Sequence, residues 1–190
     1  MSNRTLILII ALIAITVGLL WMALKNSPVP PPAQTQPTIT QILPQTTLLF
    51  GDLSTVPSTT SAKTYSLPIK ILTGNNKVTG VQLELSYDPK VLMNVSVNAG
   101  SFLANPFVLL NRVDEKNGRV SYAIGISPQD FGKTGSGIVA IINFEAQKPT
   151  LQSTAIVLLP KSLVTAESTD RSVLKATTSA QVTVGEAPAE

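Results

Sequence analysis

An alternation of apolar and polar residues over positions 81–87 limits the fold of this 190-residue chain more than any other feature of its sequence. Every second residue there is apolar and the residues between are polar, which is the period of a β-strand with one buried face. Such a strand needs a second layer of structure to cover its apolar side. The residues predicted to point inward are Val81, Leu83, Leu85 and Tyr87.

Asp88 and Pro89 follow this strand directly and indicate a corner. A carboxylate can accept hydrogen bonds from the free N–H groups of a turn, and proline has no N–H that needs a partner. We therefore expect the chain to turn there and to begin a second strand over residues 91–97.

Seven more segments carry a strand pattern, so the sequence predicts an all-β sandwich of nine strands. Residues 138–146 place Ile138, Ala140, Ile142 and Phe144 on one face and are apolar on both faces in their first half, which is typical of a central strand. Asn117-Gly118 predicts a hairpin turn, and the Ser- and Thr-rich residues 54–63 predict a loop. The other strands are expected at residues 47–52, 65–72, 107–113, 119–126, 154–159 and 180–184.

Residues 6–24 carry no charge and are interrupted only by Thr16 and Gly18. At about 1.5 Å per residue, such a helix spans roughly 30 Å of bilayer hydrocarbon, so it predicts a single transmembrane anchor. A cleaved signal peptide is the alternative, but its apolar stretch is usually shorter and ends in small residues at a fixed spacing. Arg4 and the α-amino group favour a cytoplasmic location for residues 1–5, so the domain that follows the helix is expected outside the cytoplasm.

Six prolines fall within residues 25–45, separated mostly by Gln, Thr and Ser. This segment has too few apolar groups to pack and too few N–H groups for regular hydrogen bonding, so we expect a spacer. At about 3.1 Å per residue it would reach up to roughly 65 Å. The folded domain is then expected over residues 46–185, followed by a disordered tail at residues 186–190.

The composition excludes several classes of function. The chain has no cysteine, which excludes thiolate and disulfide chemistry, and no histidine, which removes the commonest general base and the commonest metal ligand. Its net charge is +3, but the basic residues are scattered, so nucleic acid is not an expected partner. These features favour a non-catalytic binding or structural domain without a cofactor.

Four segments resemble the cohesin domain family in their order and spacing. The first begins at Gly80 and reads Gly-Val-Gln-Leu-Glu-Leu-Ser-Tyr-Asp-Pro-Lys-Val-Leu, an alternating strand that ends in Tyr-Asp-Pro before an aliphatic strand. The others begin at Gly118 (Gly-Arg-Val-Ser-Tyr-Ala-Ile-Gly), Ser136 (Ser-Gly-Ile-Val-Ala-Ile-Ile-Asn-Phe) and Val173 (Val-Leu-Lys-Ala-Thr-Thr-Ser-Ala-Gln-Val-Thr-Val). The resemblance covers residues 46–185.

This resemblance implies a nine-stranded jelly-roll sandwich related to bacterial carbohydrate-binding modules. It also implies a receptor for a dockerin-type module or another envelope protein, bound by the outward residues of the strands at 80–88 and 119–126. In the cellulosomal members, polar Asn and Asp stand early on the first of these strands, where this chain has Gly80 and Gln82. An acidic residue past the second strand is replaced here by Ser127. The candidate partner-binding residues are Gln82, Glu84, Ser86, Arg119 and Ser121.

Other motifs favour neither a catalytic nor a metal site. Gly132-Lys133-Thr134 lacks the earlier glycine of a phosphate-binding loop, because residue 127 is serine, and it predicts a hairpin loop. Glu84 and Glu145 have no cleft signal or aromatic subsite that would make them a glycosidase pair. Solvated turn carboxylates without calcium-loop spacing are expected at Asp114, Glu115, Asp130 and Asp170.

A polysaccharide-binding face would need exposed aromatic rings, and three phenylalanines fall at positions expected to be exposed. These candidate glycan contacts are Phe102, Phe107 and Phe131. A carbohydrate-binding module is therefore the first alternative to a protein receptor, and a structural envelope subunit is the second.

Overall fold

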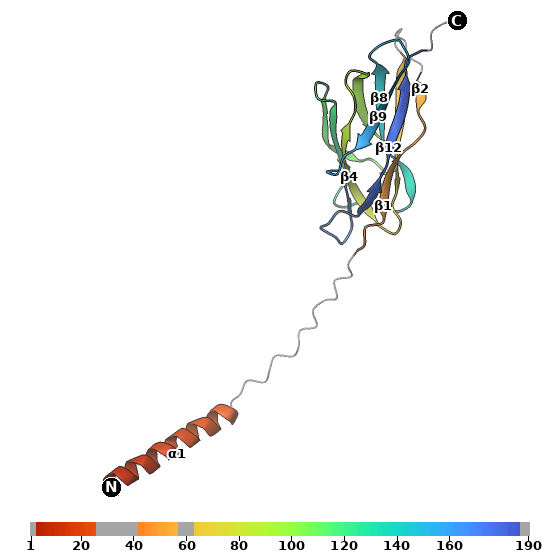
Figure 1. Cartoon of the computed structure of the whole chain (residues 1–190). Helices are drawn as coiled ribbons and strands as arrows, with labels where there is room; N and C mark the ends of the chain where they lie inside the picture. Colours follow the sequence, from red (N-terminus) through yellow and green to blue (C-terminus); the bar gives the residue numbers. More distant parts are fainter. Residues whose placement is uncertain (1–2, 26–41, 57–62, 187–190) are drawn as a thin grey trace. The chain divides into compact units, whose positions relative to one another are not determined.

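The computed structural model describes residues 3–25, 42–56 and 63–186, which belong to two compact units, Met1–Thr40 and Gln41–Glu190 (Figure 1). In the first unit, helix α1 spans Asn3–Lys25, and its stretch Leu6–Lys25 is long and apolar enough to cross a membrane. Signal sequences share this length and composition, so the helix alone does not separate an anchor from a signal sequence. Most of the expected spacer (residues 26–41) and of the expected tail (residues 187–190) lies outside the described residues.

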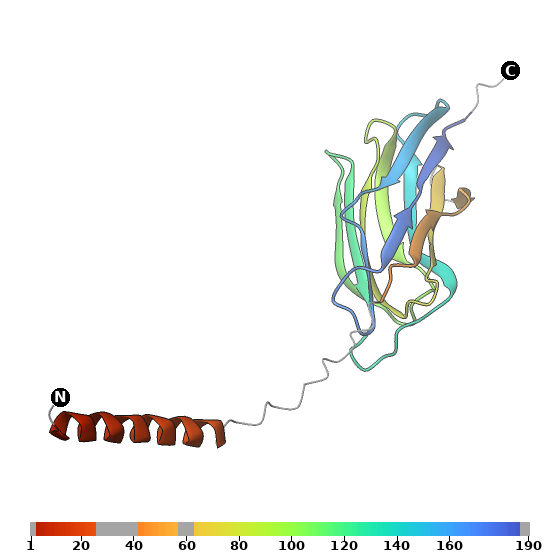
Figure 2. The same cartoon turned by 60° about the horizontal axis from the view of Figure 1, so that its bottom comes forward.

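The described part of the second unit forms two β-sheets that pack face to face (Figures 1 and 2). The β3 sheet has the strand order β11-β1-β3-β8-β5, with β2 paired to β3. Its strands are β1 (Thr46–Phe50), β2 (Ser54–Val56), β3 (Thr64–Leu72), β5 (Leu92–Ala99), β8 (Ser136–Ala146) and β11 (Leu174–Thr177). The β4 sheet has the order β12-β9-β4-β7-β6, with β10 paired to β4. Its strands are β4 (Val78–Ser86), β6 (Phe107–Asp114), β7 (Arg119–Gly125), β9 (Gln152–Leu158), β10 (Leu163–Ala166) and β12 (Ser179–Val184).

The structure confirms the predicted all-β sandwich, and its described residues contain twelve strands where nine were expected. Strand β2 lies inside the segment 54–63 that we expected to be a loop, and residues 57–62 of that segment lie outside the described residues. Strands β10 and β11 are only four residues long, too short to show a clear alternation. The three additional strands are defined by backbone pairing with a neighbour, which a single sequence does not display.

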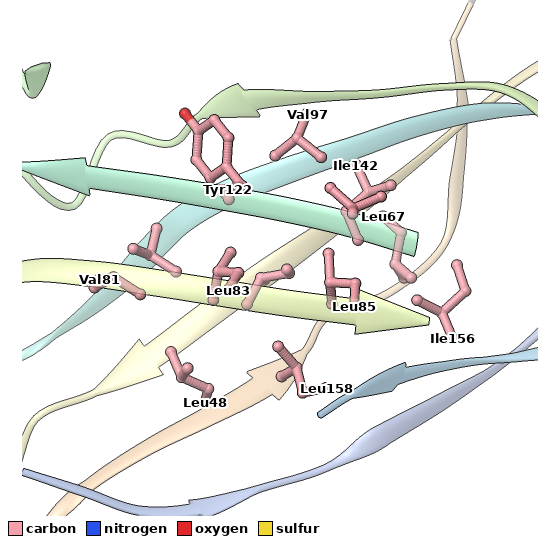
Figure 3. Packing of buried hydrophobic residues seen from close by; sticks show 14 of the residues in the cluster. Leu48, Leu67, Val81, Leu83, Leu85, Val97, Tyr122, Ile142, Ile156 and Leu158 are labelled. Carbon is pink, nitrogen blue, oxygen red and sulfur yellow. The ribbon is translucent and has the colours of Figure 1, made fainter. Parts of the chain in front are cut away.

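The predicted alternation in β4 is confirmed. The four apolar residues are buried, and the polar residues between them are half-buried on the outer face. Figure 3 shows Leu83 and Leu85 in one cluster with Leu67 and Ile142 of the opposite sheet. The inner face of β4 is thus part of the core, and its outer face is free for another role.

The predicted corner after β4 is also confirmed. The Asp88 carboxylate accepts a hydrogen bond from the backbone N–H of Lys90 (2.9 Å), and the Asp88 carbonyl accepts bonds from the N–H groups of Val91 and Leu92 (3.1 and 3.0 Å). These bonds satisfy the free donors of the turn. The turn carries the chain from β4 in one sheet to β5 in the other, so it links the two layers.

Strand β8 lies between β3 and β5, as its two apolar faces predicted. Its register against β3 shifts, because the consecutive residues Ile69 and Lys70 pair with Ala140 and Ile138. This β-bulge leaves Val139 buried beside Ala140 and Ile138 half-buried. The prediction that Ile138 shares the inward face of Ala140 is therefore wrong, since the bulge reverses the alternation at Val139.

Asn117 and Gly118 lie in the predicted hairpin, between β6 and β7. Gly118 has a φ of 60° and its carbonyl accepts a bond from the N–H of Tyr87 (2.9 Å). The Asp114 carboxylate accepts bonds from the side-chain and backbone N–H groups of Asn117 (2.8 and 3.1 Å), and these bonds lower the pKa of Asp114. Asp114 is thus a turn carboxylate, as the sequence indicated.

Buried polar residues gather where the chain joins the sandwich. The Asn76 amide donates to the carbonyl of Leu43 (3.1 Å), and its oxygen accepts from the N–H of Gln45 and the hydroxyl of Thr46 (2.9 and 3.2 Å). Asn76 therefore fixes the residues that precede β1 to the domain. We call this the linker end of the sandwich, and it also contains the loops at residues 73–77, 100–106, 126–135 and 167–172.

Replacing Leu85 by Asp should abolish cooperative unfolding, because it places a carboxylate in the core without a partner. Ser86→Asp changes the next, outward position, which lies opposite Arg119, and should shift stability by no more than about 0.5 kcal/mol. Thermal melting followed by circular dichroism compares the two variants. A Leu85→Asp domain that melts like the parent would contradict the assignment of the inner face.

Replacing Asn76 by Ala should lower the free energy of unfolding by about 1–3 kcal/mol, because the N–H of Gln45 and the carbonyl of Leu43 lose their hydrogen-bond partner, while the Thr46 hydroxyl keeps only its contact with the Thr73 carbonyl (3.3 Å). Asn75→Ala is the matched control, since Asn75 is exposed and only its backbone N–H is bonded to Gln45. Urea titration measures both variants. Equal midpoints for the two would show that the Asn76 bonds contribute nothing to stability.

Candidate partner-binding face

The outer face of the β4 sheet brings the predicted partner-binding residues together. Strands β4 and β7 are antiparallel neighbours, and Glu84 lies directly opposite Ser121. Ser86 lies opposite Arg119 in the same ladder, and Gln82 is on the same side of β4. Residues from two separate stretches of sequence therefore form one continuous surface.

Glu84 is held in a fixed position at the centre of this surface. One carboxylate oxygen accepts a hydrogen bond from Gln82 Nε2 (3.0 Å), and the other accepts one from Ser121 Oγ (2.7 Å). The backbone of Glu84 is held as well, because its N–H donates to Ser162 Oγ (3.0 Å) and its carbonyl accepts from the N–H of Leu159 (2.7 Å). The carboxylate is thus oriented before any partner arrives.

This carboxylate has no ion-pair partner among the described residues. Among the described residues, no lysine or arginine lies within salt-bridge distance of Glu84. Charge-assisted hydrogen bonds are about twice as strong as neutral ones, so a lysine or arginine of a partner would be well recognised there. Because Gln82 and Glu84 are half-buried and bonded to each other, substitutions at these positions would also change contacts within the fold.

An exposed apolar strip on β6 lies beside the polar residues. Strand β6 is the edge strand of the β4 sheet, and its first four residues are all exposed, Leu109 by 72%. Leu110 is paired with Ala123, and a methyl group added to Gly125 would lie 3.4 Å from Leu109. Because Ala123 and Gly125 of β7 are small, the side chains of Leu109 and Leu110 project above the neighbouring surface. The strip on the outer face consists of Phe107, Leu109 and Leu110, and the exposed Val108 lies opposite the buried Ile124.

Sequence reasoning missed this strip as part of the site. Four consecutive apolar residues in a hairpin strand do not alternate, so the pattern reveals no buried face. The absence of alternation was itself the available signal, because an edge strand with apolar groups on both sides must expose some of them.

The three candidate glycan contacts are not all exposed. The prediction that Phe102 is exposed is wrong: its side chain is only 1% exposed, because its N–H donates to the carbonyl of Ile138 (2.8 Å) and the loop folds back onto the core. Phe107 and Phe131 are exposed, as predicted. The cavity of about 420 Å³ at the linker end is lined by neither of them, but by polar and aliphatic residues that include Asn75, Lys77 and Glu167.

The described carboxylates outside this face form no cluster that could hold a metal ion. In the described parts of the chain, no three or more Asp and Glu residues lie close enough to hold a metal ion. Glu84 is on β4 and Glu145 is on β8, so they belong to opposite sheets and do not flank one cleft. Glu145 instead accepts a hydrogen bond from Asn94 (2.8 Å). Asn94 has a φ of 53° and lies where the register of β5 shifts.

Comparison with known proteins places this geometry in context. The model of the Cohesin domain family matches residues 53–184. The non-cellulosomal cohesin of the hyperthermophilic archaeon Archaeoglobus fulgidus is 21% identical with a TM-score of 0.54, and the match covers 75% of this chain and 92% of that one. A search of curated proteins gives no match.

Two bacterial structures are similar to the same degree. A type II cohesin domain from the cellulosome of Acetivibrio cellulolyticus is 18% identical with a TM-score of 0.55, over 73% of this chain and 95% of that one. A chain of a type I cohesin–dockerin complex from Clostridium thermocellum is 15% identical with a TM-score of 0.56, over 74% and 93%. At these identities the structural likeness shows the fold alone.

Proposed function

Because the chain belongs to the cohesin domain family, we propose that its folded domain is a non-catalytic binding module that captures a dockerin-type module of another protein. The observation that carries this proposal is the outer face of the β4 sheet, where an oriented carboxylate lies beside an exposed apolar strip. The similarity of the fold to a chain of a cohesin–dockerin complex supports a dockerin as the class of partner.

The chemistry of this face suggests how a partner would be recognised. The leucines of β6 offer apolar area, which supplies most of the free energy of association. Glu84 would receive a basic group, and Arg112 and Arg119, which flank Ser121 on the same face, would receive acidic groups. Because the sheet and Glu84 are already ordered, little conformational entropy is lost on binding.

We also propose that α1 is an uncleaved transmembrane anchor with residues 1–5 in the cytoplasm, so that the domain is displayed outside the cell membrane. The length and mean hydropathy of Leu6–Lys25 support this topology. The proline-rich residues after Lys25 would act as a spacer, and the domain would begin at Ile42, since Ile42 packs against the core and Leu43, Gln45 and Thr46 are bonded to Asn76.

Binding of a polysaccharide has less support. Phe102 is buried, and the two exposed phenylalanines lie on different elements, Phe107 on β6 and Phe131 in the loop after β7. No feature of the described residues favours a purely structural envelope subunit over a receptor.

Replacing Leu109 and Leu110 together by Asp should weaken dockerin binding at least tenfold, about 1.4 kcal/mol, because the partner must then desolvate two charges in place of apolar groups. Leu72→Asp is the matched control, since Leu72 is an exposed leucine of the opposite sheet. The probes are the dockerin modules encoded in the same genome, and the measurement is calorimetric titration. If the double variant still binds but Leu72→Asp does not, the binding site lies on the β3 sheet instead.

Removing residues 1–41 should release a soluble domain that unfolds in one cooperative transition, because the core lies wholly after this point. The full chain should instead stay with the membrane after alkaline carbonate extraction. A protease added outside intact cells should digest the domain of the full chain. Protection of the domain in that assay would reverse the proposed topology, and extraction by carbonate would refute the anchor.

A further inference from the structure

We propose that the linker end of the sandwich docks on the lipid bilayer through Phe131, with Phe107 and Leu43 at the same end. This inference rests on the proposed anchor. It concerns a surface that meets the partner-binding face only at Phe107, because Phe131 lies in a loop at the end of the strands and not on the outer side of the β4 sheet.

Phe131 is the most exposed large apolar residue among those described, at 89%. Its loop is nevertheless well held. The N–H of Gly132 donates to Glu167 Oε1 (2.6 Å), and the next residue, Lys133, exchanges two backbone hydrogen bonds with Val78 (2.9 Å each). In the residues that precede Phe131, the N–H of Asp130 donates to the carbonyl of Ser127 (2.9 Å). The ring is therefore presented outward on a bonded turn, which leaves its apolar surface in water unless something covers it.

Two other exposed apolar side chains lie at the same end of the domain. Phe107 is the first residue of β6 and pairs with Gly125, the last residue of β7, immediately before the loop that carries Phe131. Leu43 is 63% exposed, while its carbonyl is bonded to Asn76. In Figure 2 the teal loop after β7 lies at the same end as the start of β1, opposite the tip of the β6–β7 hairpin.

The charges around Phe131 are nearly balanced. Lys77 pairs with Glu167 (3.5 Å), and the Lys133 ammonium lies over the ring of Phe102 (5.3 Å) with the exposed Asp130 nearby in sequence. A surface of this kind neither needs anionic lipid nor is repelled by it. We therefore expect contact with neutral phosphatidylcholine that is insensitive to salt, because salt screens charges and not apolar burial.

The position of the linker favours a lipid bilayer as the surface that covers Phe131. Residues 26–41 join α1 to this end of the domain, and sixteen residues cannot reach further than about 58 Å. Each domain is thus confined near the membrane that its own anchor crosses. A tether gives an intramolecular contact an effective concentration in the millimolar range, so even a weak insertion of two or three side chains would be populated.

The test uses the full chain reconstituted in phosphatidylcholine vesicles, in a Trp21→Phe background that leaves the chain without tryptophan. Phe131→Trp places a reporter at the linker end. Leu151→Trp is the matched control, because Leu151 is exposed next to Thr150, which pairs with Glu186 at the opposite end. Brominated phosphatidylcholine should quench the tryptophan at position 131 roughly twofold or more over that at position 151, at low and at high salt.

Equal quenching at the two positions would overturn the docking. Blue-shifted emission at position 131 without quenching by brominated lipid would also overturn it, since protein, and not lipid, would then cover the ring. Carbonate extraction of the same vesicles reports on the anchor separately. Release of the chain would refute the anchor and this inference with it, whereas retention with equal quenching would refute the docking alone.

Discussion

The register of β4 couples the core of this domain to its candidate partner-binding face. Leu83 and Leu85 fill the interior while Gln82 and Glu84, one position away, form the outer surface. Because side chains alternate along a strand, a slip by one residue would expose the leucines and bury the carboxylate. Burial of the leucines is therefore what holds Glu84 in place, and the Asp88 corner fixes where this register ends.

The parts of the fold that could be predicted are those in which one face is buried and the other is not. Strands β3, β4 and β7 show this contrast, and their alternation of apolar and polar residues follows from it. Local rules also sufficed for the Asp88 and Asn117-Gly118 turns, because short-range hydrogen bonds determine both. In each of these cases the signal that predicts the structure lies within a few residues in the sequence.

The parts that could not be predicted depend on distant residues. Phe102 looks like a loop residue, but its burial depends on a bond to Ile138, thirty-six positions away. The bulge in β8 arises from its pairing with β3 and is invisible in the sequence of β8 itself. For the candidate site, Glu84 and Ser121 could be assigned to one face, whereas their hydrogen bond and the exposure of Leu109 required the register of two strand pairs.

The edge position of β6 explains why the apolar strip can exist. An unpaired edge with exposed leucines invites association with other strands, and many proteins prevent this with charges or bulges. Here the register of β6 shifts between Val108 and Leu110, and Arg112 and Asp114 follow on the same strand. These features disfavour the addition of another strand at the edge, yet they leave the outward side chains free. A partner that packs on the face of the sheet is therefore favoured over one that extends it.

The two proposed surfaces are compatible because one is the end of the strands and the other is the face of the β4 sheet, and they share only Phe107. The antiparallel strands of the β4 sheet extend from the linker end to the opposite end of the domain. A nine-residue strand such as β4 is about 30 Å long. If the linker end contacts the bilayer, the strands of the β4 sheet point away from the membrane plane, and the outer face of the sheet remains exposed to solvent. Glu84 and Ser121 lie beyond the middle of their strands as counted from that end, so the charged part of the face stays clear of the headgroups. Docking would then restrict the domain to orientations in which the face is accessible, and would favour capture of a partner over contact of the face with the membrane.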